Sequence, residues 1–501
     1  MDRSLVSDGQ AVVKLVNSGA RVALLCGILA VPSGAEAQVV TPKTLPVHQS
    51  GQFEMFPSAR AGMGGATIAA DDSLLDPFVN PAKATRIDVA HVFAAPFIHS
   101  VSGARGGGRS IPVGGGGSWG DWSATGLFTF QQLDRAGPAW NLSTADQSAF
   151  NQYIAGSVAR RISPSTSVGL GIQLASLDAI DGVDLLYGGS DRIEQDGSLA
   201  DFRLGLSRES ASNRQFELML VHARTEMRHD VRFTTWTWDP VKKVQVEHQR
   251  SETNEDRTHI WGLHSEYSRP VGSEGWRLGW LGTANRLSHP KIPNYVIQNI
   301  PRDPGTTYSF NGGVGISRSM RGTSFAADLI YEPMFADTWA DAARDTAITG
   351  GGTIAAGGKT VENTFKFTNL KMRLGAGHDI SMREGRTTLG IQAGLGLHSI
   401  NYRLQQTNNV LKTFRTQRED WIEWTPTLGL RLRSRDLDMI YNFSLTCGPG
   451  SCGQAWGRTF VIEDAQGPLS GGGIIAAPSD TLFMQSGSLR VHRITLLLPI
   501  R

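Results

Sequence analysis

The sequence predicts an all-β fold: a transmembrane outer-membrane β-barrel of about 14 antiparallel strands with an N-terminal plug, or hatch. Three observations predict it. Apolar residues recur at every second position, short and long connections alternate, and an export signal precedes the first strand. The 501 residues include 58 glycines and 12 tryptophans, and only 19% are charged, as is typical of β-rich exported proteins.

Residues 1–37 have the three parts of a secretory signal peptide. Lys14 and Arg21 precede an apolar run over residues 22–31, and Ala35 and Ala37 provide an A-x-A cleavage site before Gln38. Ten apolar residues are too few to cross a bilayer as a helix. We therefore expect an exported chain, with a hatch over residues 38–120 and a barrel over residues 121–501.

The clearest strands lie between residues 421 and 447. Apolar side chains occupy every second position from Ile422 to Leu432, and the pattern resumes after the turn at residues 434–436. A soluble sandwich also alternates, but its polar face is usually rich in Lys, Glu and Thr. Here the second face is rich in glycine with scattered Arg, Gln, Asp and His. We therefore expect that face to line a lumen and the apolar face to contact lipid.

The connections support a barrel, because short periplasmic turns alternating with long external loops characterise outer-membrane barrels of even strand number. The segment 89–99 is either an additional strand or part of the hatch, and its residues leave both possibilities open. A glycine-rich stretch over 105–117 is interpreted as a linker between hatch and barrel. The expected strands are 122–132, 151–162, 166–177, 199–209, 215–233, 257–268, 275–285, 308–318, 323–335, 363–378, 386–402, 420–433, 436–447 and 487–498.

Two cysteines remain after the predicted cleavage, Cys447 and Cys452, in the run CGPGSC. A close pair across a Gly-Pro turn in an oxidising compartment predicts a disulfide. Additional metal ligands are lacking nearby, so we expect no metal site. Catalytic motifs are also lacking, so we expect neither an enzyme nor a cofactor. The net charge of +2 with dispersed basic residues argues against nucleic acid as a partner.

Residues 58–82, SARAGMGGATIAADDSLLDPFVNPA, have a composition that suits neither a helix nor a strand. This stretch resembles the N-terminal signature of the FadL/TodX outer-membrane transporters of long-chain fatty acids and hydrocarbons, and that of the related PorV-type barrels. The resemblance implies a fourteen-stranded barrel closed by a hatch. The matching residues that we assign to the hatch are Gly64, Gly65, Asp71, Asp72, Asn80 and Pro81.

We therefore expect passive uptake of small hydrophobic molecules, long-chain fatty acids or hydrocarbons, through a monomer in the bacterial cell outer membrane, with outer-membrane lipid around it. The alternative from the same resemblance is a PorV-like docking or shuttle factor whose partner is secreted protein cargo. A soluble secreted β-protein is a third, weaker alternative. Four residues on polar strand faces are candidates to hold a carboxylate ligand: Arg373, His398, Arg431 and Arg433. The alternative is that they pair with lumenal acids such as Asp328, Glu332 or Glu423. Six tryptophans near strand ends are expected in the aromatic girdle: Trp236, Trp238, Trp276, Trp280, Trp421 and Trp424.

Overall fold

The computed structural model describes residues 54–101, 107–135, 147–179, 192–272, 275–289, 305–342, 344–382, 386–452 and 484–500. The predicted signal peptide and the first residues of the predicted hatch, 38–53, lie outside these ranges. Three short helices precede the strands: η1 Ala61–Met63, α2 Asp76–Val79 and η2 Pro81–Arg86. Among the described residues, no helix is long and apolar enough to cross a membrane.

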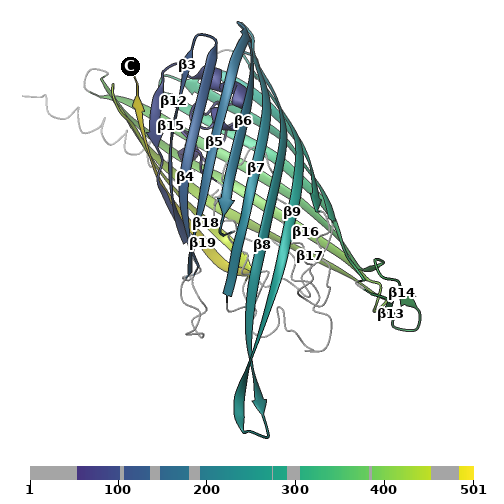
Figure 1. The fold of residues 1–501 in the computed structure, drawn as a ribbon. Helices are drawn as coiled ribbons and strands as arrows, with labels where there is room; N and C mark the ends of the chain where they lie inside the picture. Colours follow the sequence, from purple (N-terminus) through teal and green to yellow (C-terminus); the bar gives the residue numbers. More distant parts are fainter. Residues whose placement is uncertain are drawn as a thin grey trace, which may run out of the picture.

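One antiparallel sheet contains nearly all the strands and closes on itself, because the last strand pairs with the first two. Figure 1 shows the resulting barrel. The strands are β1 His91–Ala94, β2 Phe97–Val101, β3 Gly107–Trp119, β4 Trp122–Arg135, β5 Gln147–Ser163, β6 Thr166–Leu177, β7 Arg192–Glu209, β8 Gln215–Asp239, β9 Val244–Pro270, β10 Trp276–His289, β11 Gly305–Met320, β12 Thr323–Asp341, β15 Lys359–Met382, β16 Thr387–Asn408, β17 Thr413–Arg433, β18 Asp438–Cys452 and β19 Met484–Pro499. A separate small hairpin consists of β13 Thr346–Ala347 and β14 Thr353–Ile354.

The barrel is sixteen strands around rather than about fourteen. The sheet has 17 strands, but β1 and β2 lie end to end between β3 and β19 and together count as one strand of the wall. All fourteen predicted strands are present. The additional two come from residues 91–119. The open question about 89–99 is therefore resolved in favour of a strand, and the predicted linker is wrong, because residues 107–119 form β3. The barrel begins at His91 rather than at residue 121.

The glycines of β3 explain why its sequence resembles a linker. A Cβ atom at Gly115 would lie 2.5 Å from the carbonyl oxygen of His91, and one at Gly114 would lie 2.3 Å from that of Gly126. Ordinary side chains would not fit at this distance, so glycine is required here by close packing rather than by flexibility. Pro96, which has no N–H, interrupts the neighbouring strand and divides it into β1 and β2.

The two faces of the wall follow the predicted alternation. On β17, Leu428 and Leu430 are exposed on the outer surface, whereas Thr425 and Thr427 are buried inside. The same pattern holds on β16, where Ile391 is exposed. The outer surface is therefore an apolar belt, as a lipid-facing barrel wall requires. Both the first strand and the last residues lie at the end that carries the short turns, and the C-terminus marks that end in Figure 1.

Two of the predicted long external loops are strands instead. Strands β8 and β9 continue to a tight turn at 240–243, and β16 and β17 to one at 409–412. In Figure 1 the β8–β9 hairpin projects beyond the barrel at the end opposite the C-terminus. Trp236 and Trp238 lie on this projection, so the prediction that they belong to the girdle is wrong. Trp280 and Trp424 do lie on the outer surface of the barrel.

Candidate functional site: the N-terminal segment and the lumen

Residues 54–90, here called the N-terminal segment, contact lumen-facing side chains from strands all around the barrel. Its first loop is organised by Asp72, which is fully buried. The Asp72 carboxylate accepts hydrogen bonds from Ser58 Oγ at 2.6 Å and from the backbone N–H groups of Ala59 and Leu74 at 3.0 and 3.1 Å. This predicted hatch residue therefore has a structural role within the segment, because a buried carboxylate needs such donors.

The glycine pair Gly64-Gly65 lets the segment turn against the wall. Both residues have positive φ angles, 70° and 67°, which glycine adopts without strain. The Gly64 N–H donates to Thr427 Oγ1 at 3.0 Å, and the Gly65 carbonyl accepts from Arg373 Nη1 at 3.2 Å. Arg373, a predicted ligand residue, thus binds the segment itself.

The Asn80-Pro81 turn is seated against glycines of β6 and β7. A Cβ atom at Gly169 would lie 2.5 Å from the Pro81 carbonyl carbon, and one at Gly205 would lie 2.1 Å from Asn80 Oδ1. Asn80 Oδ1 accepts from the Ala82 N–H at 3.2 Å, which caps η2. Both predicted residues therefore fix the turn, and the two wall glycines provide the space for it.

A buried ammonium joins this turn to the wall. Lys83 is 5% exposed, and its Nζ lies 3.0 Å from Asp76 Oδ2 and 2.8 Å from Glu217 Oε1 on β8. The other carboxylate oxygen of Glu217 accepts from Asn80 Nδ2 at 3.1 Å. Asp71 is more open to solvent and pairs with Arg86 at 3.0 Å. Neutralisation by opposite charges allows this charged cluster to be buried.

The charges in this cluster shift its titration. Burial, only partly offset by Lys83, raises the pKa of Asp76 to about 8. Burial would also raise the pKa of Asp71, but the Lys83 and Arg86 cations outweigh it and lower that pKa to about 2. The pKa of Lys83 is raised despite burial, because Asp76 and Glu217 stabilise the ammonium.

Several further anchors were not predicted from the sequence. Asp328 Oδ2 accepts from the Thr67 N–H at 2.8 Å. Arg203 donates to the Val79 carbonyl at 3.1 Å, and Arg493 donates to the Phe56 carbonyl at 2.9 Å. Each wall residue occupies a lumen-facing position, which strand alternation identifies. Its partner on the segment cannot be found in this way, because it depends on how the strands are staggered around the barrel.

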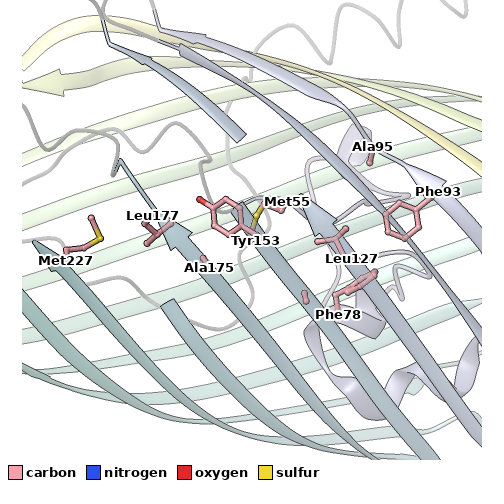
Figure 2. Close-up of a cluster of buried hydrophobic side chains, with 10 residues drawn as sticks. Met55, Phe78, Phe93, Ala95, Leu127, Tyr153, Ala175, Leu177 and Met227 are labelled. Carbon is pink, nitrogen blue, oxygen red and sulfur yellow. The ribbon is translucent and has the colours of Figure 1, made fainter. Parts of the chain in front are cut away.

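Beyond these polar contacts, part of the lumen wall is apolar. Figure 2 shows the cluster, in which Phe78 and Met55 of the segment meet wall residues. Phe78 stacks on Phe56 with ring centroids 5.0 Å apart and meets Phe93 edge-on at 6.0 Å. The buried members are Met55, Phe78, Phe93, Ala95, Leu127, Tyr153, Ala155, Ala175, Leu177 and Met227. The segment therefore contributes to an apolar surface inside the barrel as well as to polar anchors.

Three of the four predicted ligand residues pair with barrel acids. His398 Nδ1 lies 3.1 Å from Glu423 Oε2, and the Arg431 guanidinium binds Asp438, with Nε at 2.9 Å from Oδ1. Arg433 lies 3.4 Å from the same Asp438 carboxylate at the short-turn end. Arg431 and Arg433 therefore share one acid, Asp438, whereas His398 pairs with Glu423 and Arg373 binds the segment.

Cys447 is a free thiol in the structure, so the predicted disulfide with Cys452 is not formed there. Both cysteines belong to β18, whereas the prediction required a turn between them. Cys447 is opposite Ser488 and Cys452 is opposite Met484 on β19, with a register shift between Gly448 and Ser451. Four residues of extended strand cover about 13 Å, whereas a disulfide needs Cα atoms within about 7 Å.

A closed antiparallel barrel with an apolar outer belt defines an outer-membrane β-barrel protein. No protein-family model and none of the curated proteins matches the sequence. Among solved structures, the chain is similar to a Pseudomonas aeruginosa FadL homologue (10% identity, 93% of this chain, 100% of that one, TM-score 0.44). It is also similar to the Pseudomonas putida toluene transporter TodX (11% identity, 92% of this chain, 100% of that one, TM-score 0.40). Likeness at this level does not identify a function, so a functional proposal has to come from this chain's own residues.

Proposed function

We propose that the barrel carries small hydrophobic molecules passively across the bacterial outer membrane, and that the N-terminal segment is the hatch that closes it. The observation that supports this most is the apolar cluster inside the lumen. A channel for polar solutes lines its interior with polar groups. Apolar residues facing the lumen, such as Tyr153, Leu177 and Met227, instead provide a surface on which an apolar solute can leave water.

The cluster includes hatch residues, which is why the hatch is proposed to move. Phe78 and Met55 belong to the same cluster as the wall residues in this structure. A ligand that occupies the cluster replaces these side chains, so its binding favours a displaced hatch. The resemblance of residues 58–82 to the FadL/TodX signature supports the same function.

We further propose that the preferred ligand is uncharged. Three lumen-facing cations of the described strands are already engaged: Lys371 lies 3.0 Å from Glu332, Arg203 lies 2.7 Å from Asp201, and Arg493 binds hatch carbonyls. A fatty-acid carboxylate would have to break one of these contacts to gain a partner. A hydrocarbon needs none, so hydrocarbons are favoured over the fatty acids of the same length.

The test is uptake into liposomes that contain the purified full-length protein, with an alkane and a fatty acid of equal chain length as probes. We expect the protein to accelerate alkane uptake, and substitution of both Leu177 and Met227 by Asn to abolish that acceleration. A matched control is Leu170→Asn, an exposed outer-surface residue of β6. If empty liposomes take up alkane as fast, the proposal is wrong. Co-purification of secreted proteins without any transport would instead favour the docking-factor alternative.

A further inference from the structure

The projecting β8–β9 hairpin carries two exposed tryptophans far from the membrane. The outer apolar belt ends on these strands at His222 and Trp261, whose rings lie 4.1 Å apart. Trp236 is fourteen residues beyond His222, a distance of about 45 Å along a strand. Five of the six outward positions between them are charged: Arg224, Glu226, Arg228, Asp230 and Arg232. Such residues do not lie in hydrocarbon, so the tryptophans are outside the lipid.

The two tryptophans share one face of the hairpin with hydrogen-bonding side chains. Trp236 pairs directly with Glu247, and Trp238 with Gln245, so all four project from the same side. Gln249 is next on that face and donates from Nε2 to Glu247 Oε1 at 2.6 Å. The tryptophans are 60% and 57% exposed. We call these five residues the tip platform.

We propose that the tip platform binds saccharide, and specifically the saccharide chains of the lipopolysaccharide that surrounds the barrel. Sugar rings have C–H faces that pack on aromatic rings through weak C–H contacts, and hydroxyls that need donors and acceptors at the rim. Exposed indole faces beside a carboxylate and two amides provide both. A lipid surface fits less well, because it would desolvate Glu247 and Gln245 beside the tryptophans.

The position of the hairpin indicates which saccharide it would meet. The ribbon leaves the lipid at His222 and Trp261 and continues from the lipid-facing wall without a break. The saccharide chains of the outer-leaflet lipopolysaccharide extend outward from the lipid of a bacterial outer membrane, in the same direction as the hairpin. The tip platform is therefore placed to meet these chains at a distance from the lipid surface, independently of whether the barrel transports hydrophobic molecules.

The test uses lipid-free saccharide released from lipopolysaccharide, titrated into the full-length protein in nanodiscs. We expect Trp236→Ala with Trp238→Ala to weaken binding roughly tenfold or more, as for aromatic residues at the centre of an interface. Trp119→Ala with Trp122→Ala is the matched control, since these tryptophans are also exposed but flank the short turn between β3 and β4. Binding should also weaken in Glu247→Gln and should persist in high salt, because it is not driven by net charge.

Equal affinity in the wild-type protein and the Trp236/Trp238 variant would overturn the proposal. So would binding that requires phosphatidylglycerol vesicles, or a platform that captures only protein. Circular dichroism and heat-modifiable migration on detergent gels show whether each variant remains folded. All of these measurements concern binding at the hairpin, so failure of the transport proposal leaves their outcome unchanged.

Discussion

Replacing Lys83 by methionine tests whether the buried charge cluster holds the N-terminal segment in the lumen. Methionine has a similar length and fills most of the same space, so the main change is loss of the ammonium. That ammonium lies 2.8 Å from Glu217 Oε1 and 3.0 Å from Asp76 Oδ2. Without it, the Glu217 carboxylate, which is 5% exposed, stays buried with no cation beside it.

The size of the effect follows from the cost of an orphaned charge. Removing one partner of a buried ion pair costs about 3–5 kcal/mol. At about 1.4 kcal/mol per factor of ten, the ratio of seated to displaced segment falls roughly 140- to 4,000-fold. Adding Glu217→Gln removes the orphaned charge, so the double variant should recover at least about half of the lost free energy. This recovery distinguishes an electrostatic role of Lys83 from a loss of packing.

The assay is chymotrypsin cleavage of the full-length protein in detergent. Phe78, which is followed by Val79, provides a site that every variant retains. Cleavage rates follow the population of the displaced state when opening is fast. Lys242→Met is the matched control, because this lysine is exposed at the hairpin turn. Cleavage of the Lys83 variant at the wild-type rate would refute the reasoning, as would a double variant that is no more resistant than the single one.

Three further predictions use the same cleavage assay or simple thiol chemistry. Gly205→Ala should speed cleavage, since its Cβ would lie 2.1 Å from Asn80 Oδ1, and overpacking costs about 1–3 kcal/mol. The control Gly126→Ala, whose Cβ would meet no atom within 4 Å, should leave the cleavage rate unchanged. Equal cleavage rates in the two variants would contradict close packing of the Asn80-Pro81 turn against Gly205. Burial raises the pKa of Asp76 to about 8 from 3.8, so the seated state binds more protons between these values and loses stability as pH rises. Cleavage, normalised to an unfolded standard, should therefore be faster at pH 8 than at pH 5, and Asp76→Asn should abolish the difference. Unfolded protein purified without reductant should react with maleimide at Cys447, whereas protection that only a reductant removes would indicate a disulfide.

The strands could be predicted where alternation runs for ten residues or more, as on β17 and β18. The prediction failed at residues 107–119, where seven of the thirteen residues are glycine or proline. Those residue types normally indicate loops, but at Gly114 and Gly115 they are required because two backbones approach too closely for a side chain. A glycine in the sequence indicates that the backbone can be flexible at that position. Only the neighbouring strand shows whether the glycine is there for flexibility or because a side chain would not fit.

Local residues were enough to recognise the N-terminal segment, but not the contact between Lys83 and Glu217 that joins it to the barrel wall. The turn at Asn80 and Pro81 depends on residues next to each other in sequence, and so does the loop around Asp72. Lys83 and Glu217, which are in contact, lie 134 positions apart in the sequence. Alternation places Glu217 on the lumen side, because Phe216 is exposed outside. Which residue of the N-terminal segment it meets is set by the stagger of the strands, which no local pattern encodes.

The placement of charges and apolar groups on one short segment has a consequence for gating. Phe78 belongs to the apolar cluster, and Lys83, five positions later, belongs to the charged cluster. Displacing the segment must therefore break both sets of interactions together. A ligand can shift such an equilibrium only by its preference for one state. An apolar ligand restores only the apolar packing that Phe78 provided, whereas the charged cluster still opposes opening. If the proposed function is right, the charged cluster should determine how readily the segment is displaced. Replacing Lys83 should then increase passage through the barrel without ligand more than it increases the ligand-dependent transport rate.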